Sequence, residues 1–189
     1  FLDPAASNRR RSLDAAAARE LRGQLRQLVA ALDHLHKAGT LHRDVKPSNV
    51  LVGSNKAVYL IDLGLAKDAA RVDGSLVQVG FAKLIGTPAY ISPEQARGEL
   101  EQVSTASDVY SLGATLYYCL TGCPPFDQTG IELFLAMFRE DPVPLRERDP
   151  DLPVALETIC ATCLAKQPQD RYATAAELAD DLDRYLAQE

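Results

Sequence analysis

The sequence predicts a mainly α-helical domain that carries one small β-hairpin. Leucines recur at helical spacing between residues 21 and 35, and residues 108–120 are apolar nearly all round. Two short runs rich in Val, Leu, Ile and Tyr, residues 50–52 and 58–61, flank a turn-like stretch. The 189 residues, 47% of them hydrophobic, suffice for one compact domain with a substantial core. We therefore expect a single domain over residues 1–189.

The first predicted elements are a long amphipathic helix and the hairpin. The helix ends at Gly39, since glycine readily takes the left-handed conformation that closes helices. Residues 50–52 and 58–61 read as strands, and Gly-Ser-Asn-Lys at 53–56 reads as the turn between them. The apolar face of the helix is formed by Leu21, Leu25, Leu28, Leu32 and Leu35.

The remainder of the chain reads as a helical scaffold. Ser92, followed by Pro93 and by Gln95 at the third position, predicts a short capped helix. Residues 108–120 predict a helix buried in the middle of the domain, ended by Gly122.

Three further helices complete this scaffold. Residues 128–139 and 154–166 suggest helices separated by a proline-rich stretch. Thr174 and Glu177 form a capping-box pattern that opens the last helix. Its apolar face includes Leu178, Leu182, Tyr185 and Leu186.

Composition and charge exclude several classes of function. The net charge of −6 argues against nucleic acid as a main partner. No segment approaches the roughly 20 apolar residues of a membrane span, and no signal-peptide pattern opens the chain. We expect a cytoplasmic location.

The four cysteines raise the alternative of a zinc site. Cys160 and Cys163 have the spacing of half such a site, and Cys119 and Cys123 could supply the other half. Because Cys160 and Cys163 share one face of a predicted helix, we favour free thiols that pack as small hydrophobic groups.

The chemistry-bearing motifs lie around the hairpin. Residues 42–49 read His-Arg-Asp-Val-Lys-Pro-Ser-Asn, and residues 62–64 read Asp-Leu-Gly. A carboxylate such as Asp44 can orient a hydroxyl and accept its proton, and Lys46 can neutralise phosphoryl charge. Asn49 and Asp62 offer the oxygen ligands that Mg²⁺ prefers. The hairpin should bring Asp62 back beside Asn49.

Further motifs follow in order along the chain. Gly-Thr-Pro stands at 86–88, Ser-Pro-Glu-Gln at 92–95, and Asp-Val-Tyr-Ser-Leu-Gly at 108–113. Together with residues 42–49 and 62–64, they resemble the C-terminal lobe of eukaryotic-like serine/threonine protein kinases of the bacterial branch. The resemblance covers essentially the whole chain. It implies a kinase-like lobe that uses ATP and Mg²⁺ to phosphorylate serine or threonine of a protein substrate.

The resemblance also implies roles for the residues around the reacting phosphate. Asp44 would be the base, and Lys46 would contact the γ-phosphate. Asn49 and Asp62 would hold Mg²⁺. Leu51 would lie beneath the adenine.

Other residues would shape or support this site. Thr87 would bond to Asp44 and Lys46 and shape the substrate site. His42 would be structural, and Asp108 would brace the catalytic-loop backbone. Glu94 would pair with Arg171 near the end of the chain.

Regulation is implied by two basic positions. In related kinases the positions of Arg43 and Lys67 help to bind a phosphate on the activation segment. Because residues 79–85 contain no hydroxyl group, we expect apolar packing rather than phosphorylation to order that segment. The sequence departs from the family pattern in two places: Leu63 stands where Phe is usual, and Ser92 stands where Ala is usual.

Three interpretations of the whole chain remain. Residues 1–40 contain no glycine-rich phosphate loop followed by a strand lysine, and by the resemblance we expect residue 1 to lie just after the hinge between kinase lobes. We favour a piece of a longer kinase, inactive without its missing N-terminal lobe. The alternative is a pseudokinase-like binding scaffold. A small-molecule phosphotransferase fits poorly, because such an enzyme does not explain Lys46, the 92–94 motif and Arg171 together.

Overall fold

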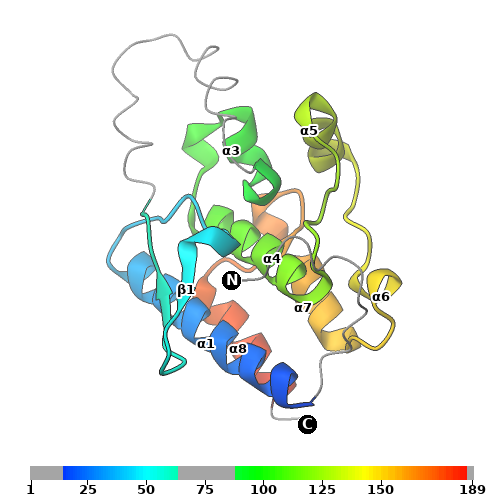
Figure 1. Ribbon diagram of the computed structural model, residues 1–189. Helices are drawn as coiled ribbons and strands as arrows, with labels where there is room; N and C mark the ends of the chain where they lie inside the picture. Colours follow the sequence, from blue (N-terminus) through cyan, green and yellow to red (C-terminus); the bar gives the residue numbers. More distant parts are fainter. Residues whose placement is uncertain (1–14, 64–87, 187–189) are drawn as a thin grey trace.

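The computed structural model describes residues 15–63 and 88–186, and it confirms a mainly α-helical fold with a single hairpin in that part of the chain (Figure 1). The helices are α1 (Ala15–Lys37), α3 (Pro93–Arg97), α4 (Thr105–Thr121), α5 (Gly130–Arg139), α6 (Leu145–Arg148), α7 (Val154–Cys163) and α8 (Ala175–Leu186). The strands are β1 (Val50–Val52) and β2 (Val58–Leu60). Short 3₁₀ turns are η2 (Pro47–Asn49), η5 (Pro88–Tyr90), η6 (Leu100–Gln102) and η7 (Pro168–Asp170).

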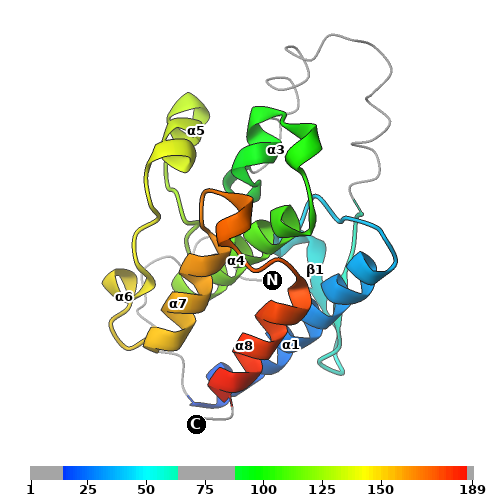
Figure 2. The same cartoon turned by 180° about the vertical axis from the view of Figure 1, so that it is seen from behind.

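Helix α4 is the centre of the fold. Thirteen of its seventeen residues are buried, as its apolar sequence predicted. It packs against α7, α1 and α6, while α1 also packs along α8 and against β2. Figures 1 and 2 show α1 and α8 side by side in both views, with α3 and α5 at the far end of the lobe. The long helices thus form a base on which the hairpin and the loop before it are mounted.

The bounds of α7 and α5 differ from the sequence prediction, and one short helix was not predicted at all. Helix α7 ends at Cys163 rather than at 166, because Arg171 binds the carbonyl oxygens of Ala165 and Lys166 and draws this backbone out of the helix. Helix α5 begins two residues later than predicted, after the extended backbone of Thr129. Helix α6 was not predicted, since four residues are too few for a recognisable periodicity.

The last helix has a modified capping box. The Glu177 amide donates to Thr174 Oγ1, as predicted, but the Glu177 carboxylate accepts from the amide of Ala173 rather than of Thr174. Leu178, Leu182 and Tyr185 are buried on the predicted face. The side chain of Leu186 lies outside the described part.

Close packing between α4 and α7 depends on one glycine. A Cβ atom added at Gly113 would lie 2.3 Å from Cys163 Cβ, well inside van der Waals contact. The Cys160 thiol, on the same face of α7, donates to the Gly113 carbonyl oxygen at 3.4 Å. All four cysteines are free, and burial raises the pKa of the Cys160 and Cys163 thiols. These two thiols therefore act as small packing groups.

No helix within residues 15–63 and 88–186 combines the length and the apolar character that crossing a membrane requires.

Two alanine substitutions test this packing. Gly113→Ala should destabilise the fold by about 1–3 kcal/mol, because the added methyl group forces α4 and α7 apart. Gly23→Ala is the matched control: Gly23 lies in α1 with open space around it, so alanine there should stabilise by roughly 0.5–1 kcal/mol. Thermal unfolding of both variants measures the difference. Equal melting temperatures would contradict the close approach at Gly113.

Candidate active site

The hairpin returns the chain to the catalytic loop, residues 42–49. Val50 pairs with Leu60, and the next amide, that of Ile61, donates to the Asn49 carbonyl oxygen at 2.9 Å. The Ile61 carbonyl oxygen in turn lies 3.0 Å from His42 Nε2. Both backbone groups of Ile61 are thus held by the loop. Asp62, the next residue, is therefore placed beside Asn49, as the sequence predicted.

His42 is fully buried and serves as a spacer between the two segments. Its Nε2–H donates to the Ile61 carbonyl, so its Nδ1 carries no proton and accepts from the Asp44 amide at 3.3 Å. Both ring nitrogens of the neutral imidazole are then satisfied by backbone groups. This arrangement gives His42 a structural position, with neither nitrogen turned toward a substrate.

Asp44 lies at the centre of a polar cluster. Its Oδ2 accepts from Lys46 Nζ at 2.8 Å and from Asn49 Nδ2 at 3.1 Å. Asn49 Nδ2 also donates to the Asp44 carbonyl oxygen at 2.8 Å. The carboxylate is therefore oriented by two donors from its own loop. Asp44 and Lys46 are both partly exposed, so a substrate can reach them.

The oxygen atoms of Asn49 and Asp62 suit Mg²⁺. Because the Asn49 amide nitrogen is engaged by Asp44, Asn49 Oδ1 is the group left to face a cation, with only a 3.5 Å contact from the Ser48 hydroxyl. Asp62 is exposed and has φ +58°, an uncommon conformation for a residue other than glycine. In the described part of the chain no hydrogen bond or ion pair engages the Asp62 carboxylate. Two hard oxygen donors, completed by water and phosphate, match the usual protein-bound Mg²⁺.

Asp108 of α4 binds the backbone at the start of the catalytic loop. Its carboxylate, 1% exposed, accepts the amide of His42 at 2.8 Å and the amide of Arg43 at 2.7 Å. His36 of α1 adds a third donor, with Nε2 2.8 Å from Asp108 Oδ2. Arg43 has φ +64°, and such strain in a residue other than glycine persists only where contacts impose it.

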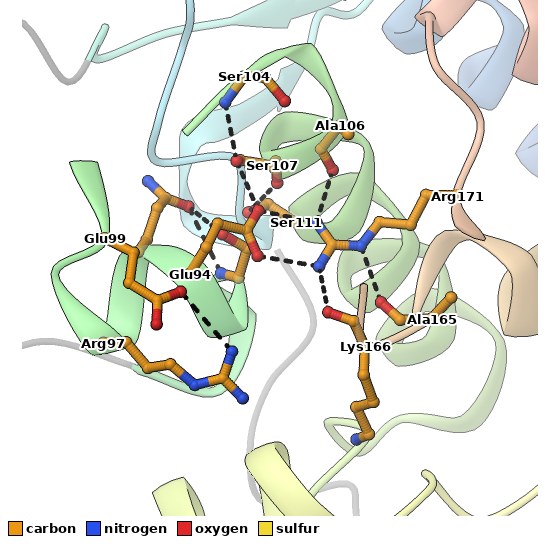
Figure 3. A network of polar contacts seen from close by, with 12 residues as sticks. Glu94, Arg97, Glu99, Ser104, Ala106, Ser107, Ser111, Ala165, Lys166 and Arg171 are labelled. Atoms are coloured by element: carbon orange, nitrogen blue, oxygen red, sulfur yellow. Dashed lines mark hydrogen bonds and ion pairs between the residues drawn. The ribbon is translucent and has the colours of Figure 1, made fainter. Parts of the chain in front are cut away.

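A second polar network joins α3 to the segment between α7 and α8 (Figure 3). Arg171 donates from Nη1 and Nη2 to the two carboxylate oxygens of Glu94, at 2.8 and 2.9 Å. Both side chains are buried, with 0% of Arg171 and 1% of Glu94 exposed. Ser107 donates to Glu94 at 2.6 Å, and the guanidinium lies 4.9 Å from the Tyr110 ring centroid. The remaining guanidinium donors bind the carbonyl oxygens of Ala106, Ala165 and Lys166.

The charge of Glu94 is stabilised by this network. Burial alone would raise the pKa of its carboxyl group. The hydrogen bonds from Arg171 and Ser107, together with the Arg171 charge, outweigh burial and lower that pKa from its usual value of 4.5. Glu94 is therefore ionised in the fold at neutral pH.

The other predicted site residues are only partly described. Leu51 lies on β1 opposite Tyr59, and both side chains are about half exposed, at 46% and 53%. Thr87 and Lys67 lie outside the described residues, so their predicted contacts stay predictions.

Three contributors to the site were missed by sequence reasoning. His36 could have been found from the sequence. It follows Leu32 by four residues and so lies on the buried face of α1, where a polar side chain needs a hydrogen-bond partner. The sequence suggests only capping roles for Ser107 and Gln95. Their contacts with Glu94 and with the Arg43 carbonyl join different segments of the chain, so no local pattern reveals them.

Comparison with known proteins agrees with this geometry. A family model described as the protein kinase domain matches residues 6–182. The chain belongs to the protein kinase family.

Several bacterial kinases are similar to this chain. Serine/threonine-protein kinase PknB of Mycolicibacterium smegmatis is 46% identical over 155 residues, which are 82% of this chain and 24% of the relative. PknB of Mycobacterium tuberculosis is 44% identical with the same shares. A probable PknB of Bifidobacterium longum is 38% identical over 160 residues, 84% of this chain and 23% of the relative. The chain thus spans about a quarter of the length of the curated relatives it matches, and it corresponds to the C-terminal lobe of a bacterial, eukaryotic-like serine/threonine kinase.

Substitution of Arg171 tests the buried ion pair of this kinase lobe. Arg171→Ala leaves the Glu94 carboxylate buried without its partner, which should cost about 3–5 kcal/mol. The exposed pair of Arg26 and Asp183 is the control, and Arg26→Ala should cost about 0–1 kcal/mol. Thermal unfolding at pH 7 compares the two variants.

The pH dependence gives a second check on the same pair. Because folding lowers the Glu94 pKa, this stabilisation is present above pH 4.5 and is lost as the pH falls through the lowered value. The difference in melting temperature between the wild type and Arg171→Ala should therefore become smaller as the pH falls below 4.5. A difference in melting temperature that is small at pH 7, or that does not change with pH, would contradict a buried, ionised pair of Glu94 and Arg171.

Proposed function

We propose that this lobe works within a longer kinase that transfers the ATP γ-phosphate to serine or threonine of a protein substrate. The observation that carries the proposal is the Asp44 cluster: a partly exposed carboxylate oriented by Lys46 at 2.8 Å and by Asn49 at 3.1 Å. A scaffold would need no such arrangement of a base, a cation and a metal-ligating amide.

In the proposed reaction the substrate hydroxyl oxygen attacks the γ-phosphorus as the bond to ADP breaks. Asp44 orients the hydroxyl and accepts its proton. Lys46 lies close enough to Asp44 to neutralise charge on the transferring phosphoryl group. Mg²⁺, which Asn49 and Asp62 would hold, supplies neutralisation of the nucleotide phosphates. Thr87 would help to shape the part of the site that binds the protein substrate.

The nucleotide and partner assignments are part of the same proposal. Leu51 would face the adenine, and its exposed position on β1 leaves an apolar surface for a base. The N-terminal lobe would bring the glycine-rich loop and the strand lysine that residues 1–40 do not contain. Four free cysteines favour a reducing compartment, which supports a cytoplasmic location.

A phosphotransfer assay tests the proposal. With labelled ATP, Mg²⁺ and a generic basic protein, the 189 residues alone should turn over little, because catalysis here depends on positioning by both lobes. The complete kinase should be active. In it, Asp44→Asn and Asp62→Asn should each remove most activity with an unchanged circular dichroism spectrum.

The outcomes separate the competing interpretations. An inactive complete kinase would favour the binding scaffold. Near-normal turnover in either variant would show that the roles are misassigned, and robust turnover by the 189 residues alone would overturn the need for a second lobe.

A further inference from the structure

The peptide group between Arg43 and Asp44 is held at both of its ends. Its carbonyl oxygen, that of Arg43, accepts a hydrogen bond from Gln95 Nε2 at 3.1 Å. Its N–H, that of Asp44, donates to His42 Nδ1 at 3.3 Å. Because a peptide group is planar, fixing both ends fixes the bond from the Asp44 nitrogen to its Cα, from which the side chain branches. The contact from Gln95 thus bears directly on the geometry of the proposed base.

Gln95 is itself held in one orientation. Its Oε1 accepts from the Ser92 hydroxyl at 3.0 Å and from the Ser92 amide at 3.4 Å, which leaves Nε2 as the donor toward Arg43. The adjacent residue, Glu94, is tied to Arg171 in the core of the lobe. The side chain of Gln95 therefore projects from a short helix that cannot easily shift.

The strain at Arg43 explains why this contact is needed. With φ +64°, Arg43 occupies a conformation that costs of order 1–3 kcal/mol unless its surroundings impose it. Asp108 from α4 secures the amide side of Arg43. Gln95 from α3 secures the carbonyl side, so two separate helices hold the one strained residue that precedes Asp44.

We propose that Gln95 is a positioning residue for phosphotransfer, which couples the N-terminus of α3 to the Arg43–Asp44 peptide. The inference rests on the proposed function and extends it. Gln95 touches neither nucleotide nor hydroxyl. Its contact holds the Arg43 carbonyl from the anchored start of α3, and thereby helps to place the backbone that carries the Asp44 carboxylate.

The test is Gln95→Glu, which preserves the shape of the side chain. The carboxylate keeps an acceptor for Ser92 but sets an oxygen, instead of the Nε2 donor, against the Arg43 carbonyl. In the complete kinase we expect kcat to fall about tenfold or more, as expected for a small misplacement of the base, with KM for ATP within about twofold of wild type. Gln102→Glu is the matched control, since Gln102 is exposed in η6 and the change in charge is the same.

A second measurement needs no catalytic activity. Amide hydrogen exchange of the 189-residue chain should show faster exchange at Arg43 and Asp44 in Gln95→Glu, and unchanged exchange in α8. Gln95→Met, which removes the donor without adding charge, should do the same and covers the case in which Gln95→Glu fails to fold.

The results test the role of Gln95 separately from the proposed phosphotransfer function. Unchanged exchange at Arg43 and Asp44 in both variants, or an unchanged kcat in an active kinase, would overturn the role of Gln95. A complete wild-type kinase without turnover would overturn the proposed function, while the exchange data would still decide whether Gln95 holds the loop.

Discussion

The catalytic loop depends on one buried carboxylate. Asp108, on the most buried helix of the lobe, accepts the amides of His42 and Arg43 and a ring N–H of His36. A buried carboxylate is costly unless donors surround it, and here the donors are the loop backbone itself. The same contacts that satisfy Asp108 therefore impose the left-handed conformation of Arg43 and set the start of the loop.

The rest of the lobe can be understood as the support of that carboxylate. Helix α4 is held by two contacts: Gly113 lets α7 approach closely, and Ser107 binds Glu94. Glu94 is in turn held by Arg171, which follows η7, so α3 and the segment between α7 and α8 are tied to the same helix. Rigid helices thus place a loop whose own residues, 42–49, form no long regular element. Such positioning on rigid elements is what phosphoryl transfer requires.

The sequence predicted the elements that periodicity and local motifs determine. The leucine spacing found α1, the apolar run found α4, and the hairpin return of Asp62 to Asn49 followed from two short strands and a turn. The resemblance to kinases gave the pair of Glu94 and Arg171, which no local pattern could supply across 77 positions. It could not give the contact between Gln95 and Arg43, because that glutamine was already explained by its cap. The predicted end of α7 was wrong for another reason: Arg171, five and six residues further along, binds the carbonyl oxygens of Lys166 and Ala165, and periodicity alone does not reveal such a contact.

Amide hydrogen exchange of Asp108→Asn tests whether Asp108 holds the catalytic loop. An asparagine offers one acceptor oxygen where the carboxylate offers two, so one of the two loop amides must lose its acceptor. We expect faster exchange at the amide of His42 or of Arg43, with the protection of the α8 and hairpin amides retained. Unchanged protection at both amides, in a variant that remains folded, would contradict it.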